Sequence, residues 1–182
     1  IDVSLVGSEM CIRDSNIGFK IIDAINSKFK LSKQKPKFKG LLTTGNINEK
    51  KVYAIKPLTF MNNSGICIRE LIEYFKIEAE NIIVFHDDLD IDFGKIKTKF
   101  GGSSAGHNGI ESIDKFIGKD YSRVRIGIGK PNDKIAVSDY VLKDFDDDEK
   151  QQLETLKNNI TENLAILIDK KLDLFSSTVN NK

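Results

Sequence analysis

Segments with the side-chain period of a β-strand alternate along this chain with segments whose apolar residues recur at helical spacing. The strand patterns lie at 41–44, 52–55, 82–85 and 124–128, and the helical stripes lie at 21–29, 68–75, 110–117 and 153–167. Such an alternation places helices against the faces of a mostly parallel sheet. We therefore expect an α/β domain with a central, partly parallel sheet and a frayed tail at 175–182.

Length and composition narrow the class of protein. The 182 residues suffice for one domain, and no apolar run approaches the roughly 20 residues that a membrane helix needs. The two cysteines, Cys11 and Cys67, are too few for a disulfide framework, and we expect Cys67 to pack in a core. No signal-peptide pattern is recognisable. These features predict a cytosolic protein of one domain.

The net charge of +1 predicts no polyanionic partner by itself, but the charges are segregated along the chain. Six lysines crowd the stretch 28–39, Lys95, Lys97 and Lys99 alternate in another, and acidic residues gather at 144–149. A segregated basic surface attracts phosphate locally. Solvated lysines in a lysine-rich proteome are the alternative, and charge alone leaves both interpretations open.

The first fourteen residues differ in character from the rest. The chain opens at Ile1 without a methionine, and the string VSLVGSEMCIRD at Val3–Asp14 resembles a translated sequencing adapter. Val3–Val6 matches a strand pattern, although apolar tetrapeptides occur easily by chance. We therefore predict a non-native segment at 1–14 and a single natural domain at 15–182.

Two polar stretches follow strand patterns. TFMNNSG at Thr59–Gly65 carries asparagine amides that can hold a carbonyl or a ribose hydroxyl, with a helix cap and local turn as the alternative. HDDLD at His86–Asp90 ends the strand pattern 82–85, and ligands bind at the carboxyl ends of strands in open α/β sheets. A carboxylate there can orient a histidine base or join a metal site, with a polar loop and one capping aspartate as the alternative.

A third stretch, Lys95–Ile110, is rich in glycine. Its glycines leave backbone amides accessible to an anion, and His107-Asn108 opens the following helical stripe. A helix N-terminus favours a phosphate or a developing oxyanion. The stretch contains neither a dinucleotide-binding fingerprint nor a P-loop, and a flexible linker is the alternative.

Taken in order, these stretches resemble the bacterial-type peptidyl-tRNA hydrolase family. The motifs that carry the resemblance are NIGF at Asn16–Phe19, KPLTFMNNSG at Lys56–Gly65, HDDLD, GGSSAGHNG at Gly101–Gly109, RVRIGIGKP at Arg123–Pro131 and YVL at Tyr140–Leu142. The resemblance extends from Asn16 to the C-terminal helix. It implies a three-layer α/β/α fold with a twisted mixed sheet. It also implies a mostly monomeric enzyme that needs no metal or cofactor and hydrolyses the ester between peptide and tRNA, which recycles tRNA in translation.

The resemblance also assigns roles to residues. Asp87 matches the aspartate that orients the catalytic histidine, and Asn62 and Asn108 match the asparagines that bind substrate and help to place the water. The candidate substrate- and tRNA-binding residues are Phe60, Asn62, Lys97, Lys99, His107, Asn108 and Arg125. Ester hydrolysis needs a base near neutral pH, a positioned water and donors for the oxyanion. Basic side chains give affinity for tRNA phosphates without reading base sequence.

The chain departs from the family pattern at the expected general base. Ser15 directly precedes Asn16–Phe19, where the family has histidine, and the family's asparagine-proline-glycine loop is absent. Serine does not titrate near pH 7, and removal of a general base typically costs about 10²–10⁴-fold in rate. The departure stops where the adapter-like string stops. We therefore expect the natural gene to encode the histidine and the polypeptide as written to be nearly inactive.

Two other classes of protein remain open. A catalytically inert tRNA- or RNA-binding homologue would keep the basic residues and have no use for Asp87. A metal-dependent hydrolase could combine His86, Asp87, Asp88, Asp90 and His107, although adjacent aspartates on a strand point to opposite faces. Loss of activity with a chelator would distinguish the metal-dependent hydrolase from the family interpretation.

Overall fold

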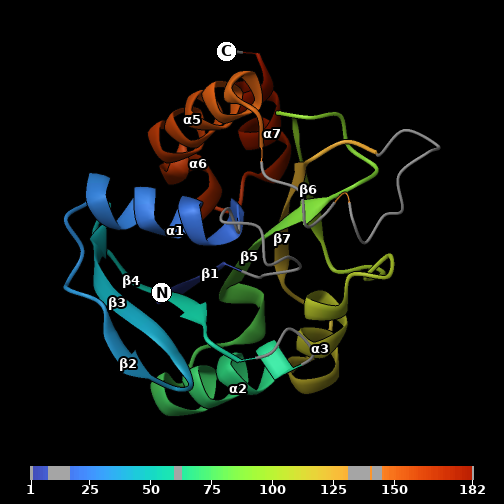
Figure 1. Cartoon of the computed structure of the whole chain (residues 1–182). Coiled ribbons are helices and arrows are strands. Elements are labelled where there is room, and N and C mark those ends of the chain that lie inside the picture. Colours follow the sequence, from blue (N-terminus) through green and yellow to red (C-terminus); the bar gives the residue numbers. More distant parts are fainter. Residues whose placement is uncertain (1, 8–16, 60–62, 131–139, 141–144, 182) are drawn as a thin grey trace.

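The strands in the described part of this chain form one mixed sheet (Figure 1). The computed structural model describes residues 2–7, 17–59, 63–130, 140 and 145–181. Within these ranges the strand order is β2-β3-β4-β1-β5-β7-β6. The strands are β1 Val3–Gly7, β2 Lys35–Lys37, β3 Gly40–Ile47, β4 Lys50–Pro57, β5 Ile82–Asp88, β6 Ile96–Phe100 and β7 Ser122–Gly127.

The neighbouring strands β4, β1, β5 and β7 run in the same direction. The pairs β2–β3, β3–β4 and β6–β7 are antiparallel. A parallel strand is covered on both faces, which fits the unbroken apolar run at the start of β5. The carboxyl ends of four strands therefore share one edge of the sheet, and the predicted mixed, partly parallel sheet is confirmed.

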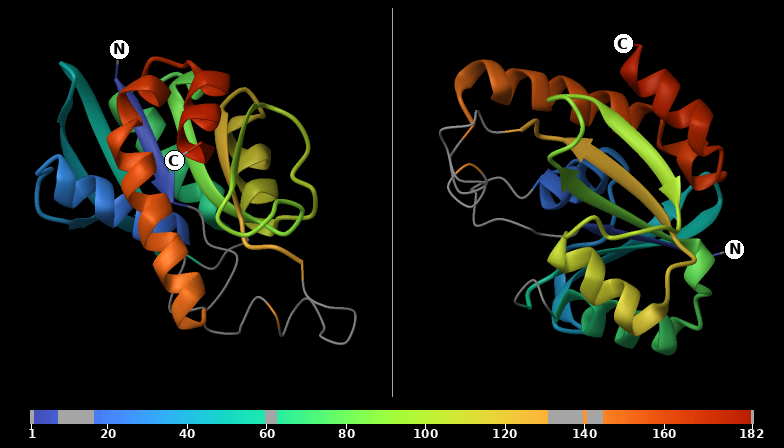
Figure 2. Two further views of the ribbon diagram at one scale, coloured as in Figure 1. Left: turned by 90° about the horizontal axis from the view of Figure 1, so that it is seen from above. Right: turned by 90° about the vertical axis from the view of Figure 1, so that its right-hand side faces the viewer.

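Helices cover both faces of the sheet and give the expected three layers (Figure 2). The helices are α1 Ile17–Lys28, α2 Ser64–Phe75, α3 Asn108–Ile117, α5 Asp147–Glu162, α6 Leu164–Ile168 and α7 Leu172–Asn180, with a short 3₁₀ turn η2 at Ala79–Asn81. Apolar residues of α1, α5, α6 and α7 form one core, and those of α2 and α3 form the other. None of the helices in the described ranges combines the length and apolar character needed to cross a bilayer.

β1 lies in the middle of the sheet, between β4 and β5. Leu5 is opposite Ala54 on one side and Ile83 on the other, and the whole strand is buried. At its carboxyl end, a Cβ on Gly7 would lie 2.7 Å from the Gly18 carbonyl oxygen, so glycine lets α1 begin directly beside β1. The first strand pattern thus forms the centre of the sheet, while the non-native origin of 1–14 stays a prediction.

The predicted fraying at 175–182 is wrong as far as Asn180, because α7 packs against the sheet. Phe175 and Val179 are buried in the core with α5. The Asn180 side chain accepts from the Ile96 amide and donates to the Ile96 carbonyl, both at 2.9 Å. An asparagine amide therefore takes the place of a neighbouring strand at the outer edge of β6, where unpaired backbone groups would otherwise remain.

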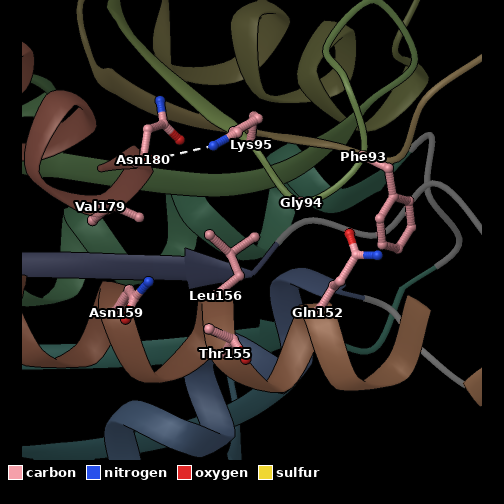
Figure 3. A pocket seen from close by; sticks show the side chains of 9 residues that line it. All are labelled: Phe93, Gly94, Lys95, Gln152, Thr155, Leu156, Asn159, Val179 and Asn180. Atoms are coloured by element: carbon pink, nitrogen blue, oxygen red, sulfur yellow. Dashed lines mark hydrogen bonds between the residues drawn. The ribbon is translucent and has the colours of Figure 1, made fainter. Parts of the chain in front are cut away.

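A cavity of about 210 Å³ remains between α5, α7 and the turn that precedes β6 (Figure 3). The Lys95 ammonium donates to the Asn180 carbonyl at 3.0 Å in its wall. Its described lining also includes Gln152, Thr155 and Asn159, and none of the predicted site residues. The cavity is therefore distinct from the candidate site at the strand ends.

The packing of α7 predicts that Phe175→Ala destabilises the fold. Truncation of a fully buried aromatic residue typically costs about 3–5 kcal/mol. Urea unfolding of the full chain measures the change, and Leu174→Ala, at a half-exposed position of the same helix, is the matched control. Equal midpoints for the two variants would mean that α7 does not contribute to the core.

Candidate active site

The polar end of β5 places side chains on both faces of the sheet. Because side chains alternate along a strand, Asp87 lies on the face of Phe85, which α1 covers. His86 and Asp88 lie on the face of Val84, toward α3. His86 and Asp87 are buried, at 4% and 8% exposure. Burial of an imidazole or a carboxylate is costly without partners, so the contacts of these residues indicate what the site can do.

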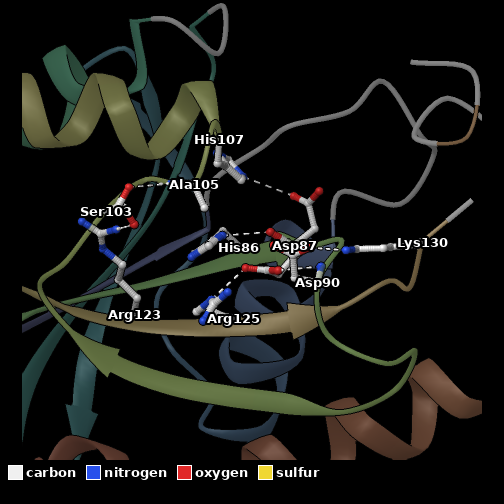
Figure 4. A network of polar contacts seen from close by, with 10 residues as sticks. His86, Asp87, Asp90, Ser103, Ala105, His107, Arg123, Arg125 and Lys130 are labelled. Atoms are coloured by element: carbon white, nitrogen blue, oxygen red, sulfur yellow. Dashed lines mark hydrogen bonds and ion pairs between the residues drawn. The ribbon is translucent and has the colours of Figure 1, made fainter. Parts of the chain in front are cut away.

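His107 is the N-cap residue of α3 and faces Asp87 (Figure 4). The Ile110 amide donates to His107 Nδ1 at 3.2 Å, so this nitrogen carries no proton. The proton of the neutral ring is therefore on Nε2, which lies 3.4 Å from Asp87 Oδ1. That separation is long for a hydrogen bond, as is common in catalytic sites before the reacting complex forms. Asp87 thus faces an N–H donor at the start of α3.

His86 packs edge-on against His107, with ring centroids 4.9 Å apart. Its Nδ1 lies 2.9 Å from the Asp87 carbonyl oxygen, which can only accept, so this nitrogen carries the proton. Burial, followed by the proximity of His107, lowers the pKa of His86 to about 3. His86 is therefore neutral at physiological pH, and its other nitrogen is a weak base.

Neither histidine of the chain is suited to act as a general base. The pKa of His86 is too low for the role, and a second proton on His107 would occupy the nitrogen that caps α3. The sequence contains only these two histidines. Ser15, at the position of the expected base, lies outside the described residues, as do Phe60 and Asn62.

The predicted phosphate contacts lie together beside His86. The strand register places Lys97 of β6 opposite Arg125 of β7, and Arg125 next to His86 of β5. Arg125 Nε donates to Asp88 Oδ2 at 2.7 Å, which orients the guanidinium. Lys97 and Lys99 are exposed on β6. The structure thus gathers Lys97, Lys99 and Arg125 on the α3 side of the sheet.

Close packing at Gly65 holds the start of α2 against α3. The Gly65 amide donates to Ser112 Oγ at 3.0 Å, and a Cβ at Gly65 would collide with the Ser112 carbonyl oxygen. The last residue of the TFMNNSG stretch is therefore fixed next to the helix that follows the glycine-rich stretch. Asn108, the first residue of that helix, is exposed.

Two of the carboxylates considered for a metal site have cations as partners. Asp88 bonds to Arg125, and Asp90 Oδ1 lies 2.8 Å from Lys130 Nζ. Within the described part of the chain, no group of three or more His, Cys, Asp or Glu side chains is arranged to hold a metal. Cys67 packs in the core as expected, and burial raises the pKa of its thiol to about 12.

Arg123 is a buried residue to which the sequence interpretation assigned no role. It donates to the carbonyl oxygens of Ser103 at 2.9 Å and Gly102 at 3.2 Å, and to Asp114 Oδ1 at 2.7 Å. The alternation of Arg123, Val124 and Arg125 places both arginines on one face. No sequence signal distinguishes the buried arginine from the partly exposed one.

The low pKa of His86 predicts that acid destabilises the fold from pH 6.5 downward. An unfolded histidine binds a proton near pH 6.5, whereas His86 in the folded state remains neutral down to about pH 3. The unfolded state therefore binds more protons in this window, and the free energy of unfolding falls as pH falls. Urea unfolding at pH 7.5 and 5.5 measures the change. His86→Gln should reduce it, and an equal change in that variant would contradict the assignment.

Known proteins share both the sequence and the fold of this chain. The peptidyl-tRNA hydrolase family model matches residues 7–182. The peptidyl-tRNA hydrolase of Pelagibacter ubique (strain HTCC1062) is 80% identical over 167 residues, 92% of this chain and 90% of that protein. The enzyme of that name from Ehrlichia canis (strain Jake) is 43% identical over 178 residues, 96% of this chain and 90% of that protein. The crystal structure of peptidyl-tRNA hydrolase from Acinetobacter baumannii has a TM-score of 0.86 and 29% identity, covering 98% of this chain and 93% of that one. The chain therefore belongs to the peptidyl-tRNA hydrolase family.

Proposed function

We propose that this domain is built to hydrolyse the ester between peptide and tRNA in peptidyl-tRNA, with Asp87 orienting the catalytic base. The main observation behind the proposal is the position of Asp87. This residue is buried at the carboxyl end of β5, on the face that α1 covers, and its Oδ1 lies 3.4 Å from His107 at the start of α3. A carboxylate so placed holds an imidazole in one tautomer and stabilises its protonated form.

In the proposed reaction, a histidine at position 15 takes a proton from water, and the water oxygen attacks the ester carbonyl carbon. The bond from that carbon to the ribose oxygen then breaks, the peptide leaves with a free carboxyl group, and the ribose oxygen receives the proton. Asn62, Asn108 and the amides at the start of α3 place the water and stabilise the oxyanion. No metal or cofactor enters the scheme, and we propose a monomeric cytoplasmic enzyme.

The polypeptide with Ser15 is proposed to be nearly inactive and its segment 1–14 to be non-native. Two observations support this. Neither His86 nor His107 is suited to act as the base. The string at Val3–Asp14 resembles a translated sequencing adapter, which supports a non-native origin of the segment.

A restored histidine should restore hydrolysis. We expect Ser15→His, in a chain that also carries the family's first strand and loop, to raise the rate by about 10²–10⁴-fold, the usual contribution of a general base. Release of free tRNA from peptidyl-tRNA measures the rate, with and without a chelator. Asp87→Asn should remove most of the gain, whereas Asp92→Asn, on the exposed loop after β5, should not. Loss of the restored activity with chelator would favour a metal-dependent hydrolase.

A catalytically inert tRNA-binding homologue is the second candidate, and Ser15 itself favours it. Such a protein would use Lys97, Lys99 and Arg125 for phosphate and have no use for the Asp87–His107 contact. The histidine-restored chain distinguishes the two. Binding of tRNA without turnover in that chain would support the binding homologue and reject the hydrolase.

The basic cluster on β6 predicts a salt-dependent affinity for tRNA. Lys97→Ala and Lys99→Ala should each weaken binding and reduce the slope of log K against log salt by about one, the contribution of one phosphate contact. Binding of uncharged tRNA to the chain as it exists, measured from about 50 to 200 mM salt, tests this. Lys150→Ala on α5 is the matched control. If all three variants gave the same slope of log K against log salt, β6 would not be part of the tRNA interface.

A further inference from the structure

The glycine-rich stretch follows a strained backbone path before it enters α3. Gly101, Gly102, Ala105 and Gly106 have φ values of 67°, 92°, 49° and 80°. Ala105 carries a Cβ in the left-handed region, which L-residues other than glycine rarely adopt. Such a path persists only where the surrounding structure over-determines it.

Few bonds within the stretch itself support this path. The Ala105 amide donates to Ser103 Oγ at 3.2 Å, and the His107 amide donates to the Ser104 carbonyl at 3.0 Å. Both bonds are local, whereas the Gly101 amide, at the start of the segment between β6 and α3, donates to the Tyr121 carbonyl at 3.0 Å. Residues 102–106 therefore need further support from a group outside this segment.

Arg123 supplies that support from β7 (Figure 4). Nη1 donates to the Ser103 carbonyl at 2.9 Å, while Nη2 donates to the Gly102 carbonyl at 3.2 Å and to Asp114 Oδ1 at 2.7 Å. The arginine is 2% exposed, and its guanidinium lies 4.7 Å from the centre of the Tyr121 ring. A planar guanidinium can reach acceptors on the stretch and on α3 at once, which the single ammonium of lysine cannot do with the same geometry.

We propose that Arg123 is a positioning residue. It joins the carbonyls of residues 102 and 103 to Asp114 and thereby fixes the positions of His107 and Asn108 in the site. The inference rests on the proposed function, because it assigns His107 and Asn108 to the site of ester hydrolysis. Arg123 itself is buried and acts through the backbone that it holds.

The proposed role separates two kinetic effects. Asn108 and the amides of α3 act on the reacting atoms, and a displacement of about 1 Å there can lower a rate by about 100-fold. Lys97 and Lys99 bind through β6, which is held by its own pairing with β7. Loss of Arg123 should therefore lower kcat and leave KM nearly unchanged.

The test compares Arg123→Lys with Tyr121→Phe in the full chain. The tyrosine variant removes a 2.7 Å hydrogen bond to Asp114 and leaves both carbonyl bonds of Arg123 in place. In the histidine-restored chain, Arg123→Lys should lower kcat by about 10- to 100-fold, with KM within about threefold. In the chain as it exists, it should speed amide hydrogen exchange at His107 by about tenfold or more, because the stretch opens locally. Tyr121→Phe should lower Tm without either change.

A kcat within threefold of the parent, or unchanged exchange at His107, would overturn the positioning role. Equal losses of kcat in both variants would reduce Arg123 to a structural residue and also overturn it. If the lysine variant does not fold, the neutral pair Arg123→Gln with Asp114→Asn replaces it, because that pair avoids an unpaired buried charge. If the histidine-restored chain has no turnover at all, the proposed function fails, and the exchange at His107 still decides the role of Arg123.

Discussion

The backbone hydrogen bonds on both edges of β1 hold the two halves of the sheet together. β1 pairs with β4 and with β5, and all of its residues are buried. A buried peptide group without a partner costs about 1–3 kcal/mol, so a break at β1 would leave several such costs uncompensated. The backbone pairing requires only that the core side chains be apolar, because Val3 and Leu5 lie in one core and Val6 lies in the other. A short run of apolar residues satisfies this position, even one that we propose to be non-native.

The common direction of β4, β1, β5 and β7 also determines where the candidate functional side chains lie. Their carboxyl ends share an edge, and alternation along β5 sends Asp87 to the α1 face and Asp88 to the α3 face, on which Arg125 of β7 also lies. Asp87 faces the N-cap histidine of α3, whereas Asp88 orients Arg125. The carboxylate proposed to orient the base and the arginine proposed to bind phosphate thus have different partners. Changes in tRNA affinity can therefore leave the geometry of proton transfer intact.

Elements with an apolar period could be predicted from the sequence, and elements without one could not. β6 has a period of two in which lysines alternate with Ile96, Thr98 and Phe100, but its apolar run is too short to mark a core strand. β2 is a Lys-Pro-Lys edge strand with no apolar period. The tail around Phe175 reads as polar, and only its contact with the core and the bond from Asn180 to β6 make it helical. The location of Asp87 could be predicted, because ligands bind at the carboxyl ends of strands in open α/β sheets. The N-cap role of His107 depends on the Ile110 amide, a contact that the motif does not encode by itself.

Arg123 and Arg125 differ in role because they differ in burial, although they share one strand and one sheet face. Arg125 retains a quarter of its side chain exposed and bonds to one carboxylate, so it can respond to a phosphate in solvent. Arg123 is enclosed, and its donors go to two carbonyls and Asp114. Salt screens exposed charges far more than buried ones. The proposed contacts of Lys97, Lys99 and Arg125 with tRNA should therefore weaken as salt rises, whereas the backbone path of the glycine-rich stretch, which the buried Arg123 holds, should persist across the same range of salt.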